Sequence, residues 1–326
     1  MPTSRLPRWR RWRRRAYYLV TVGLLAVAGR VPVGPGRALG RCLARAALVL
    51  RPRERRRARA NLALALPEHD EGARRALLAA SARRLGENLH DTLAAPRLLG
   101  RPGFVVEEPC AATGGRPVGE VVAALGEAGR GVLILTGHLG CWELLGGWLA
   151  RELPRHGAGP LAVVTGTVHN PGVDRLLQRR RQAAGLRTLP RDGGAAPLLR
   201  HLGAGGTAAV LLDQRLAVPS LPVPFFGRPA PTAAGFGRLV LRRGVPVLPV
   251  AIGRLGGGHV VRHLAPLLPP PDPAAARDDA RVAAFLAACN GALEEMVRRN
   301  PAEWVWFHPR WTEDATDAMD PTEEAT

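Results

Sequence analysis

Residues 131–150 read GVLILTGHLGCWELLGGWLA and place a short apolar run directly before an amphipathic segment. Residues 132–135 are all apolar, too few for a helix and typical of a strand buried on both faces. After a Thr-Gly turn, apolar residues recur at helical spacing from Trp142 onward. His138 therefore lies where the strand ends, and Glu143 lies in the first turn of the helix. A base and a carboxylate at such a corner can activate a small molecule's hydroxyl at the edge of a sheet.

The same alternation of short apolar runs and helical patterns continues beyond residue 105. Strands are expected at residues 132–135, 161–165, 186–189, 207–212, 245–252 and 259–264. Helices are expected at residues 121–128, 142–151, 173–184, 195–202, 233–243 and 274–299, after three earlier helices at 38–50, 53–66 and 71–93. The pattern predicts an α/β fold, with a mixed, mostly parallel sheet flanked by helices.

The positive charge of the chain is concentrated near its N-terminus. Of the net charge of +19, residues 1–60 contribute +16, from 17 Arg and one acid, Glu54. A nucleic-acid-binding protein would spread arginines over its folded domain. Arginines that flank an apolar segment are instead typical of the cytoplasmic side of a membrane. We therefore expect a membrane partner and no nucleic acid.

Composition divides the chain into four parts. Residues 1–35 are expected to form an Arg-rich membrane anchor, and residues 36–104 a helical, membrane-associated segment. The uncharged stretch 16–29 has fourteen residues, fewer than the roughly twenty that span a bilayer, so a signal peptide and an amphipathic surface helix remain alternatives. Residues 105–311 form the main α/β domain, and the acidic tail 312–326 is expected to be disordered. The four cysteines form no CxxC pair, so neither a disulfide framework nor a zinc site is indicated.

A histidine followed five residues later by an acid is a weak pattern by itself. It recurs at His169 and at His308, and a structural histidine at a helix N-terminus is the ordinary interpretation. A second candidate is VLLDQR at residues 210–215, an apolar strand with Asp213 and Gln214 at its carboxyl end. If the two strands are parallel, these side chains share the sheet edge with His138; the alternative is a capping Asp in an ordinary turn.

Two further stretches carry candidate binding residues. VPFFGRPAPTAAG at residues 223–235 predicts a loop held by Pro and Gly, with Phe225 and Phe226 exposed to an alkyl chain or a membrane. The same two rings also suit a hydrophobic core. DRLLQRRRQAAGLR at residues 174–187 predicts a cationic helix, which can grip phosphate by forked hydrogen bonds, although such a run is commonly a solvated face.

Four motifs together resemble the late lauroyl/myristoyl acyltransferases of lipid A biosynthesis, within the lysophospholipid acyltransferase superfamily. They are GHLGCWE at 137–143, DQR at 213–215, VPFFGRPAPT at 223–232 and WVWFHPRW at 304–311. The resemblance implies a glycerolipid-acyltransferase-like fold and an enzyme at the cell inner membrane, with its catalytic domain on the cytoplasmic side. It implies transfer of a fatty acyl group from a thioester on acyl carrier protein or coenzyme A to a hydroxyl of a lipid A precursor, in lipopolysaccharide biosynthesis.

The resemblance also implies roles for individual residues. His138 is the general base and Glu143 its orienting partner, while Arg181 acts near the oxyanion or the donor, within a residue or two. The strand-end acid is Asp213. Substrate or donor contacts are expected from the neighbouring motif residues Gln214, Phe225, Phe226 and Gly227. No GxSxG nucleophile context occurs, which favours direct transfer without an acyl-enzyme, and neither a cofactor nor a metal is expected.

Two other functions remain open from the sequence. The same chemistry suits a phosphatidylinositol mannoside, another glycolipid or a lysophospholipid as acceptor. Members with mannoside acceptors tend to carry Asp where Glu143 stands, which favours lipid A. A protein that only binds lipid or acyl carrier on the membrane, without catalysis, is the non-enzyme alternative.

Overall fold

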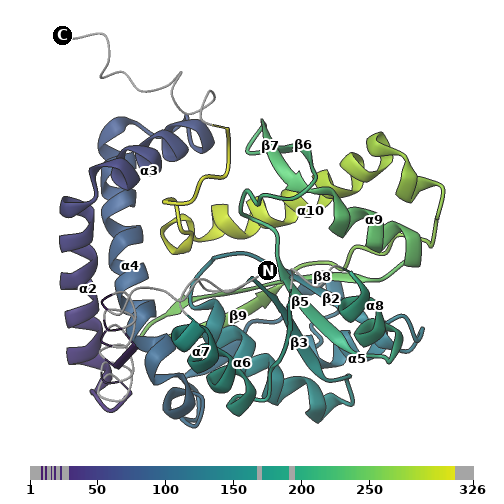
Figure 1. Cartoon of the computed structure of the whole chain (residues 1–326), viewed down its shortest axis with the longest axis horizontal. Helices are drawn as coiled ribbons and strands as arrows, with labels where there is room; N and C mark the ends of the chain where they lie inside the picture. The colour runs from purple at the N-terminus through teal and green to yellow at the C-terminus, as the bar shows by residue number, and fades with distance from the viewer. Residues whose placement is uncertain are drawn as a thin grey trace.

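The computed structural model describes residues 29–166, 171–190 and 195–312, together with six single positions nearer the N-terminus, and for Pro171 and Val173 only the backbone. Within these residues, seven strands form the main sheet (Figure 1). Their order is β1 (Val105–Glu107), β9 (Gly258–His263), β8 (Val247–Leu255), β2 (Val132–Thr136), β5 (Thr207–Leu211), β3 (Leu161–Thr165) and β4 (Arg187–Pro190). Only the β8–β9 pair is antiparallel among these described strands. The mixed, mostly parallel sheet expected from the sequence is thus confirmed.

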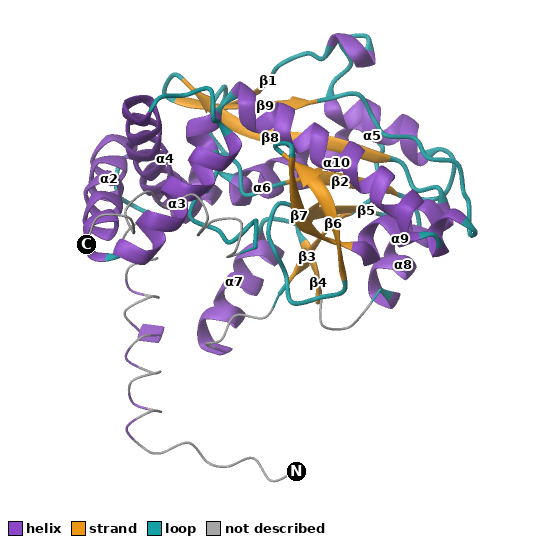
Figure 2. Ribbon diagram, turned by 90° about the horizontal axis from the view of Figure 1, so that it is seen from above, coloured by secondary structure: helices purple, strands orange, loops and turns teal. Residues whose placement is uncertain are grey.

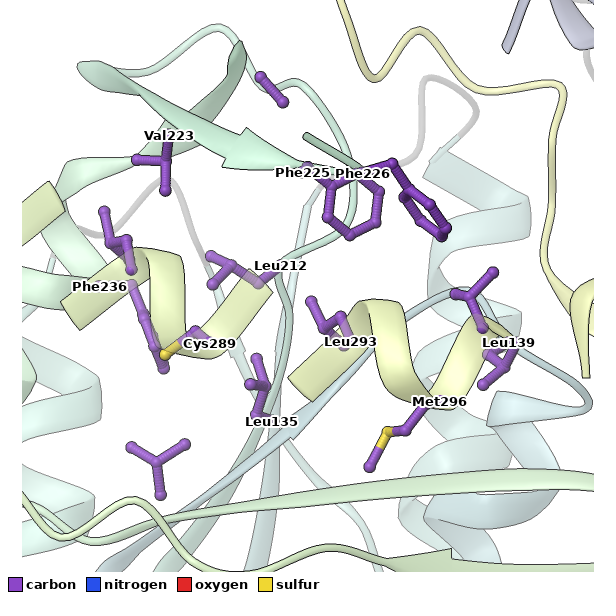
Figure 3. Packing of buried hydrophobic residues seen from close by; sticks show 14 of the residues in the cluster. Leu135, Leu139, Leu212, Val223, Phe225, Phe226, Phe236, Cys289, Leu293 and Met296 are labelled. Carbon is purple, nitrogen blue, oxygen red and sulfur yellow. The ribbon is translucent and has the colours of Figure 1, made fainter. Parts of the chain in front are cut away.

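Helices cover both faces of the sheet, as the alternating pattern predicts (Figure 2). Helices α5 (Val118–Gly126) and α6 (Trp142–Glu152) pack on one face, against a cluster that includes Ile134 and Val250. Helices α8 (Ala196–Gly203), α9 (Ala234–Arg243) and α10 (Asp279–Arg299) lie on the other. There Leu135 faces Cys289 and Leu293 of α10 within the larger hydrophobic core (Figure 3). Helix α7 (Pro171–Ala183) precedes the outermost strand, β4.

Three N-terminal helices stand beside one end of the sheet (Figure 1). They are α2 (Val33–Leu50), α3 (Pro52–Ala65) and α4 (Glu71–Leu98). Helices α2 and α4 touch backbone to backbone, since a Cβ on Gly40 would lie 2.0 Å from the carbonyl oxygen of Gly86. The buried carboxylate of Asp91 on α4 joins this arm to the sheet, because it pairs with Arg37 of α2 and with Arg254 and His259 of β8 and β9.

None of the helices in the described part of the chain combines the length and the apolar character that a membrane span needs. Much of the predicted anchor, residues 1–35, falls outside the described residues, and so does the acidic tail beyond residue 312. Both expectations therefore stay predictions.

The stretch expected to be a loop, residues 223–235, is instead part of a hairpin. Strands β6 (Ser220–Phe225) and β7 (Arg228–Ala233) pair antiparallel around a two-residue turn. Its four prolines lie opposite one another in two pairs, Pro222–Pro231 and Pro224–Pro229. These pairs alternate with the hydrogen-bonded pairs of the ladder, so the missing N–H groups cost nothing. Proline in the sequence therefore suggests an irregular loop, although it is compatible with this two-stranded sheet, in which the proline positions need no N–H donor.

Candidate active site

Parallel pairing of β2 and β5 brings His138 and Asp213 to the same sheet edge, because Thr136 is in register with Leu211. The Nδ1 atom of His138 lies 2.9 Å from Oδ1 of Asp213, and the His138 backbone N–H donates to Oδ2 at 2.6 Å. The indole N–H of Trp304 also donates to Oδ2, at 2.8 Å. Gly137 makes room for the carboxylate, since a Cβ there would lie 2.9 Å from Oδ2.

The environment of Asp213 keeps it ionised. Burial alone would raise its pKa, but the charge of His138 and the hydrogen bonds from His138 and Trp304 together lower the pKa to about 2. An ionised carboxylate at Nδ1 holds the proton of the neutral imidazole on that nitrogen. The lone pair is thereby left on Nε2 of His138, the atom that can accept a proton from a substrate.

A second histidine lies close to the first, linked through Gln214. The Nε2 atom of the Gln214 amide is 3.1 Å from Nε2 of His138 and 2.6 Å from Nε2 of His308. The two imidazole centroids are 4.8 Å apart. Burial, followed by the charge of His138, lowers the pKa of His308 to about 4, so His308 is neutral near pH 7 and its Nε2 accepts from the amide.

The structure corrects the expected pairing of His138 with Glu143. The Glu143 carboxylate forms a two-pronged ion pair with Arg181 of α7, in which Nε lies 3.2 Å from Oε2 and the second contact joins Nη2 to Oε1. The partner that orients His138 is Asp213. Spacing along the chain favours Glu143, whereas sheet pairing across 75 residues supplies the closer carboxylate.

Of the arginines on α7, Arg181 is the one that faces the site. Arg180 donates to the backbone oxygen of Leu93, and the side chain of Arg179 is exposed. The position suggested by the resemblance is therefore the one next to Glu143.

A cavity of about 710 Å³ opens beside these groups. Its wall includes His138, Glu143, Arg181 and Gln214, and the remaining lining is mainly apolar. The apolar part comes from the sheet and from α6, α8 and α9, including Leu145, Leu149, Val163, Leu198, Phe236 and Leu239. A mostly apolar cavity with a few polar groups at the reactive centre suits a long acyl chain.

Phe225, Phe226 and Gly227 are not where the sequence reasoning expected them. Both rings are buried in the core (Figure 3). Phe225 packs against Trp304 and Trp311, and Phe226 packs against Trp304 and Trp306. Gly227 takes a φ of +69° in the hairpin turn. The alternative interpretation, that these rings fill the core, is the correct one.

The C-terminal segment forms one side of the site, which sequence reasoning missed. The N–H of Val305 donates to the carbonyl oxygen of His138 at 3.2 Å, and Leu139 bridges to Trp304. Asn61 of α3 donates to the carbonyl oxygens of Trp306 and His308, at 2.7 and 2.8 Å. The motif at 304–311 contributed to the resemblance, but no pattern within it indicated that His308 would lie beside His138.

Across the described residues, no group of three or more His, Cys, Asp or Glu side chains is arranged to hold a metal ion. The groups that are present can perform proton transfer. An oriented imidazole offers the Nε2 lone pair beside an apolar cavity, which is the arrangement that general-base attack by a hydroxyl requires.

Comparison with known proteins agrees with this chemistry. The chain is similar to the phosphatidylinositol mannoside acyltransferase of Mycolicibacterium smegmatis, with 25% identity over 195 residues, 59% of this chain and 60% of the relative. It is also similar to the protein of that name in Mycobacterium tuberculosis, with 26% identity over 201 residues, 59% of this chain and 58% of the relative. The match thus spans about three-fifths of the length of these relatives. The family model described as bacterial lipid A biosynthesis acyltransferase matches residues 5–313, and the chain therefore belongs to that acyltransferase family.

Proposed function

We propose that the protein is an O-acyltransferase that moves a fatty acyl group from a thioester to a hydroxyl of a glycolipid. The observation that carries the proposal is the Asp213–His138 pair, because His138 also lines the mainly apolar cavity of about 710 Å³. The donor is a thioester of acyl carrier protein or coenzyme A, and its alkyl chain occupies the cavity.

The proposed reaction is direct transfer. The acceptor hydroxyl attacks the thioester carbonyl while its proton passes to Nε2 of His138, and Asp213 stabilises the resulting imidazolium. The tetrahedral oxyanion then collapses, the C–S bond breaks, and His138 returns the proton to the leaving sulfur. No covalent enzyme intermediate is formed.

For the acceptor, the similar proteins favour a phosphatidylinositol mannoside, since that is the acceptor in their names. The family description favours a lipid A precursor instead. Both are glycolipids with free hydroxyls, so the chemistry is shared. We propose the mannoside as the first candidate acceptor and lipid A as the second. The sequence had favoured lipid A, because position 143 is Glu instead of Asp.

We further propose that the protein works at the cytoplasmic face of the inner membrane. Helix α2 supports this, because Leu39, Leu43, Val49 and Leu50 are all more than half exposed. Residues 1–60, which include α2, contain 17 arginines. Arginines close in sequence to an exposed apolar helix face suit binding to an anionic lipid surface.

The function is tested with purified protein, an acyl-coenzyme A or acyl-carrier donor, and either glycolipid. Mass spectrometry should detect an added acyl group on one acceptor, and His138→Ala should abolish it while leaving membrane association intact. His156→Ala, in the 3-10 turn that follows α6 and outside the cavity lining, is the matched control. Saturable binding of donor or lipid without any product would instead favour a binding protein, and product on both acceptors would leave the choice to lipid analysis of a deletion strain.

A further inference from the structure

We propose that Gln214 is a mobile hydrogen-bond donor. Its side-chain amide donates to His138 in the free enzyme and to the oxyanion during acyl transfer. In this proposal His308 is a positioning residue that holds the Gln214 amide in place. The inference rests on the proposed acyl transfer and adds the group that stabilises its transition state.

The geometry of the free enzyme defines the starting point. One amide nitrogen stands between two imidazoles, 3.1 Å from Nε2 of His138 and 2.6 Å from Nε2 of His308. A primary amide nitrogen has two hydrogens and no acceptor lone pair, so both imidazole nitrogens must accept. Asp213 supports this assignment for His138, because it takes the proton-bearing Nδ1 at 2.9 Å.

Proton transfer to His138 forces the amide to find another acceptor. Nε2 of His138 has one lone pair, so the acceptor hydroxyl displaces the Gln214 N–H when it bonds to Nε2, and the proton that is then transferred there keeps that N–H away. The same event creates an oxyanion on the carbon that has just bonded to the attacking oxygen. In this proposal the oxyanion comes within reach of the freed N–H, so the new bond gains its strength only as negative charge develops in the transition state. A donor that binds the transition state more strongly than the ground state raises kcat, whereas a donor that binds both states equally does not.

Arg181 is less suited to the same role. Its guanidinium uses two of its five N–H groups on the oxygens of Glu143, and proton transfer to His138 does not release or switch the other three. The Gln214 hydrogen, by contrast, is released by the reaction itself.

His308 explains why the amide nitrogen, rather than its oxygen, faces the base. If the amide turned over, its carbonyl oxygen would face the lone pairs of two neutral imidazoles. His308 stays neutral because burial lowers its pKa to about 4. Its backbone is fixed in turn by Asn61, whose amide donates to the His308 carbonyl oxygen at 2.8 Å.

The proposal is tested by removing the donor while keeping the shape. Gln214→Met has a side chain of similar length and no N–H, and Gln214→Glu offers only acceptors when ionised. Both should lower kcat by about 100-fold, with KM changed by less than about threefold, as loss of one oxyanion donor does elsewhere. Gln182→Met, on the exposed side of α7, is the matched control and should retain the wild-type kcat.

His308 is tested by exchange and rescue. His308→Phe removes the acceptor and should lower kcat by about tenfold, whereas His308→Gln restores an acceptor oxygen and should recover most of that loss. A merely structural role would not produce this rescue at equal thermal stability.

The outcomes separate this proposal from the function on which it rests. A wild-type protein that acylates neither glycolipid contradicts the proposed function. An active wild type whose folded Gln214→Met variant keeps kcat within threefold, or loses activity only through KM, overturns the donor role. Equal activities of His308→Phe and His308→Gln overturn the positioning role.

Discussion

Two carboxylates lie near the catalytic corner, in different surroundings. The side chain of Glu143 is about a quarter exposed and shares its charge with Arg181. Asp213 is almost completely buried and accepts from two groups of His138 and from Trp304. A buried carboxylate with three donors has one fixed position, so Asp213 is the residue able to set the imidazole tautomer.

Replacing that carboxylate by an amide should therefore act on the chemical step. Asp213→Asn keeps the volume but can donate to Nδ1, which favours the tautomer with the proton on Nε2. We expect kcat to fall by about 10³–10⁴-fold, with a nearly native circular dichroism spectrum. Steady-state kinetics on the folded variant measures the effect; a loss below tenfold would show that another group orients His138.

The buried His308 should make stability depend on pH. Its pKa is about 4 in the native protein against 6.5 for the ordinary side chain. Between these values the unfolded chain binds a proton that the native state does not, so the free energy of unfolding falls as pH drops from 6.5 to 4. Integration over this window gives up to about 3 kcal/mol.

Urea unfolding at pH 7 and at pH 4.5 checks this window for the wild type and for His308→Gln. The variant lacks the titrating group, so its loss of stability between the two pH values should be smaller by about 2 kcal/mol. Equal losses in the two proteins would contradict the assignment of a lowered pKa to His308.

At the scale of single elements, six of the seven strands of the main sheet were predictable, whereas the three-residue strand β1 and the hairpin were not. Runs such as residues 132–135 and 207–212 are strongly apolar and bounded by Gly or Asp, which leaves few alternatives to a buried strand. In the hairpin, four prolines mask the alternation, and only the register reveals that they avoid the hydrogen-bonded pairs. The buried positions of Phe225 and Phe226 follow from that register, so they too escaped prediction.

The hairpin turn supplies a stability test. Phe226 and Gly227 both have positive φ, 51° and 69°, as a type I′ turn requires. A Cβ at Gly227 would meet nothing within 4 Å, so Gly227→Ala should cost only the backbone strain, about 1–2 kcal/mol.

Gly291 is the matched control, because it lies inside α10 with the same open surroundings and no positive φ. Gly291→Ala should stabilise the protein by about 0.5–1 kcal/mol, opposite in sign to the turn variant. Denaturant midpoints compare the two; destabilisation of equal size at both positions would point to lost packing instead of strain.

At the scale of the whole molecule, the N-terminal arm and the catalytic edge form one unit. Ser81 of α4 donates to the carbonyl oxygen of Trp304, and Asn61 of α3 donates to those of Trp306 and His308 in the same segment. These bonds link residues more than 200 positions apart. Residue spacing predicts only which side chains lie close within one helix or strand. The motifs could therefore be located from the sequence, but the contacts between them could not.

Residues 1–28 precede this unit and hold seven arginines and no acid. Each arginine near an anionic bilayer contributes about 1 kcal/mol of attraction, so deletion of residues 1–28 should strongly weaken sedimentation with anionic vesicles. Turnover of detergent-dispersed substrate should persist, because every site residue lies beyond position 60.

A variant with the seven arginines changed to Gln keeps the apolar stretch, so it separates the contribution of charge from that of apolar burial. If charge dominates, it should resemble the deletion on anionic vesicles at low salt; if it sediments like the wild type, the apolar stretch is the anchor. Unchanged sedimentation of the deletion itself would assign membrane binding to the exposed face of α2 instead.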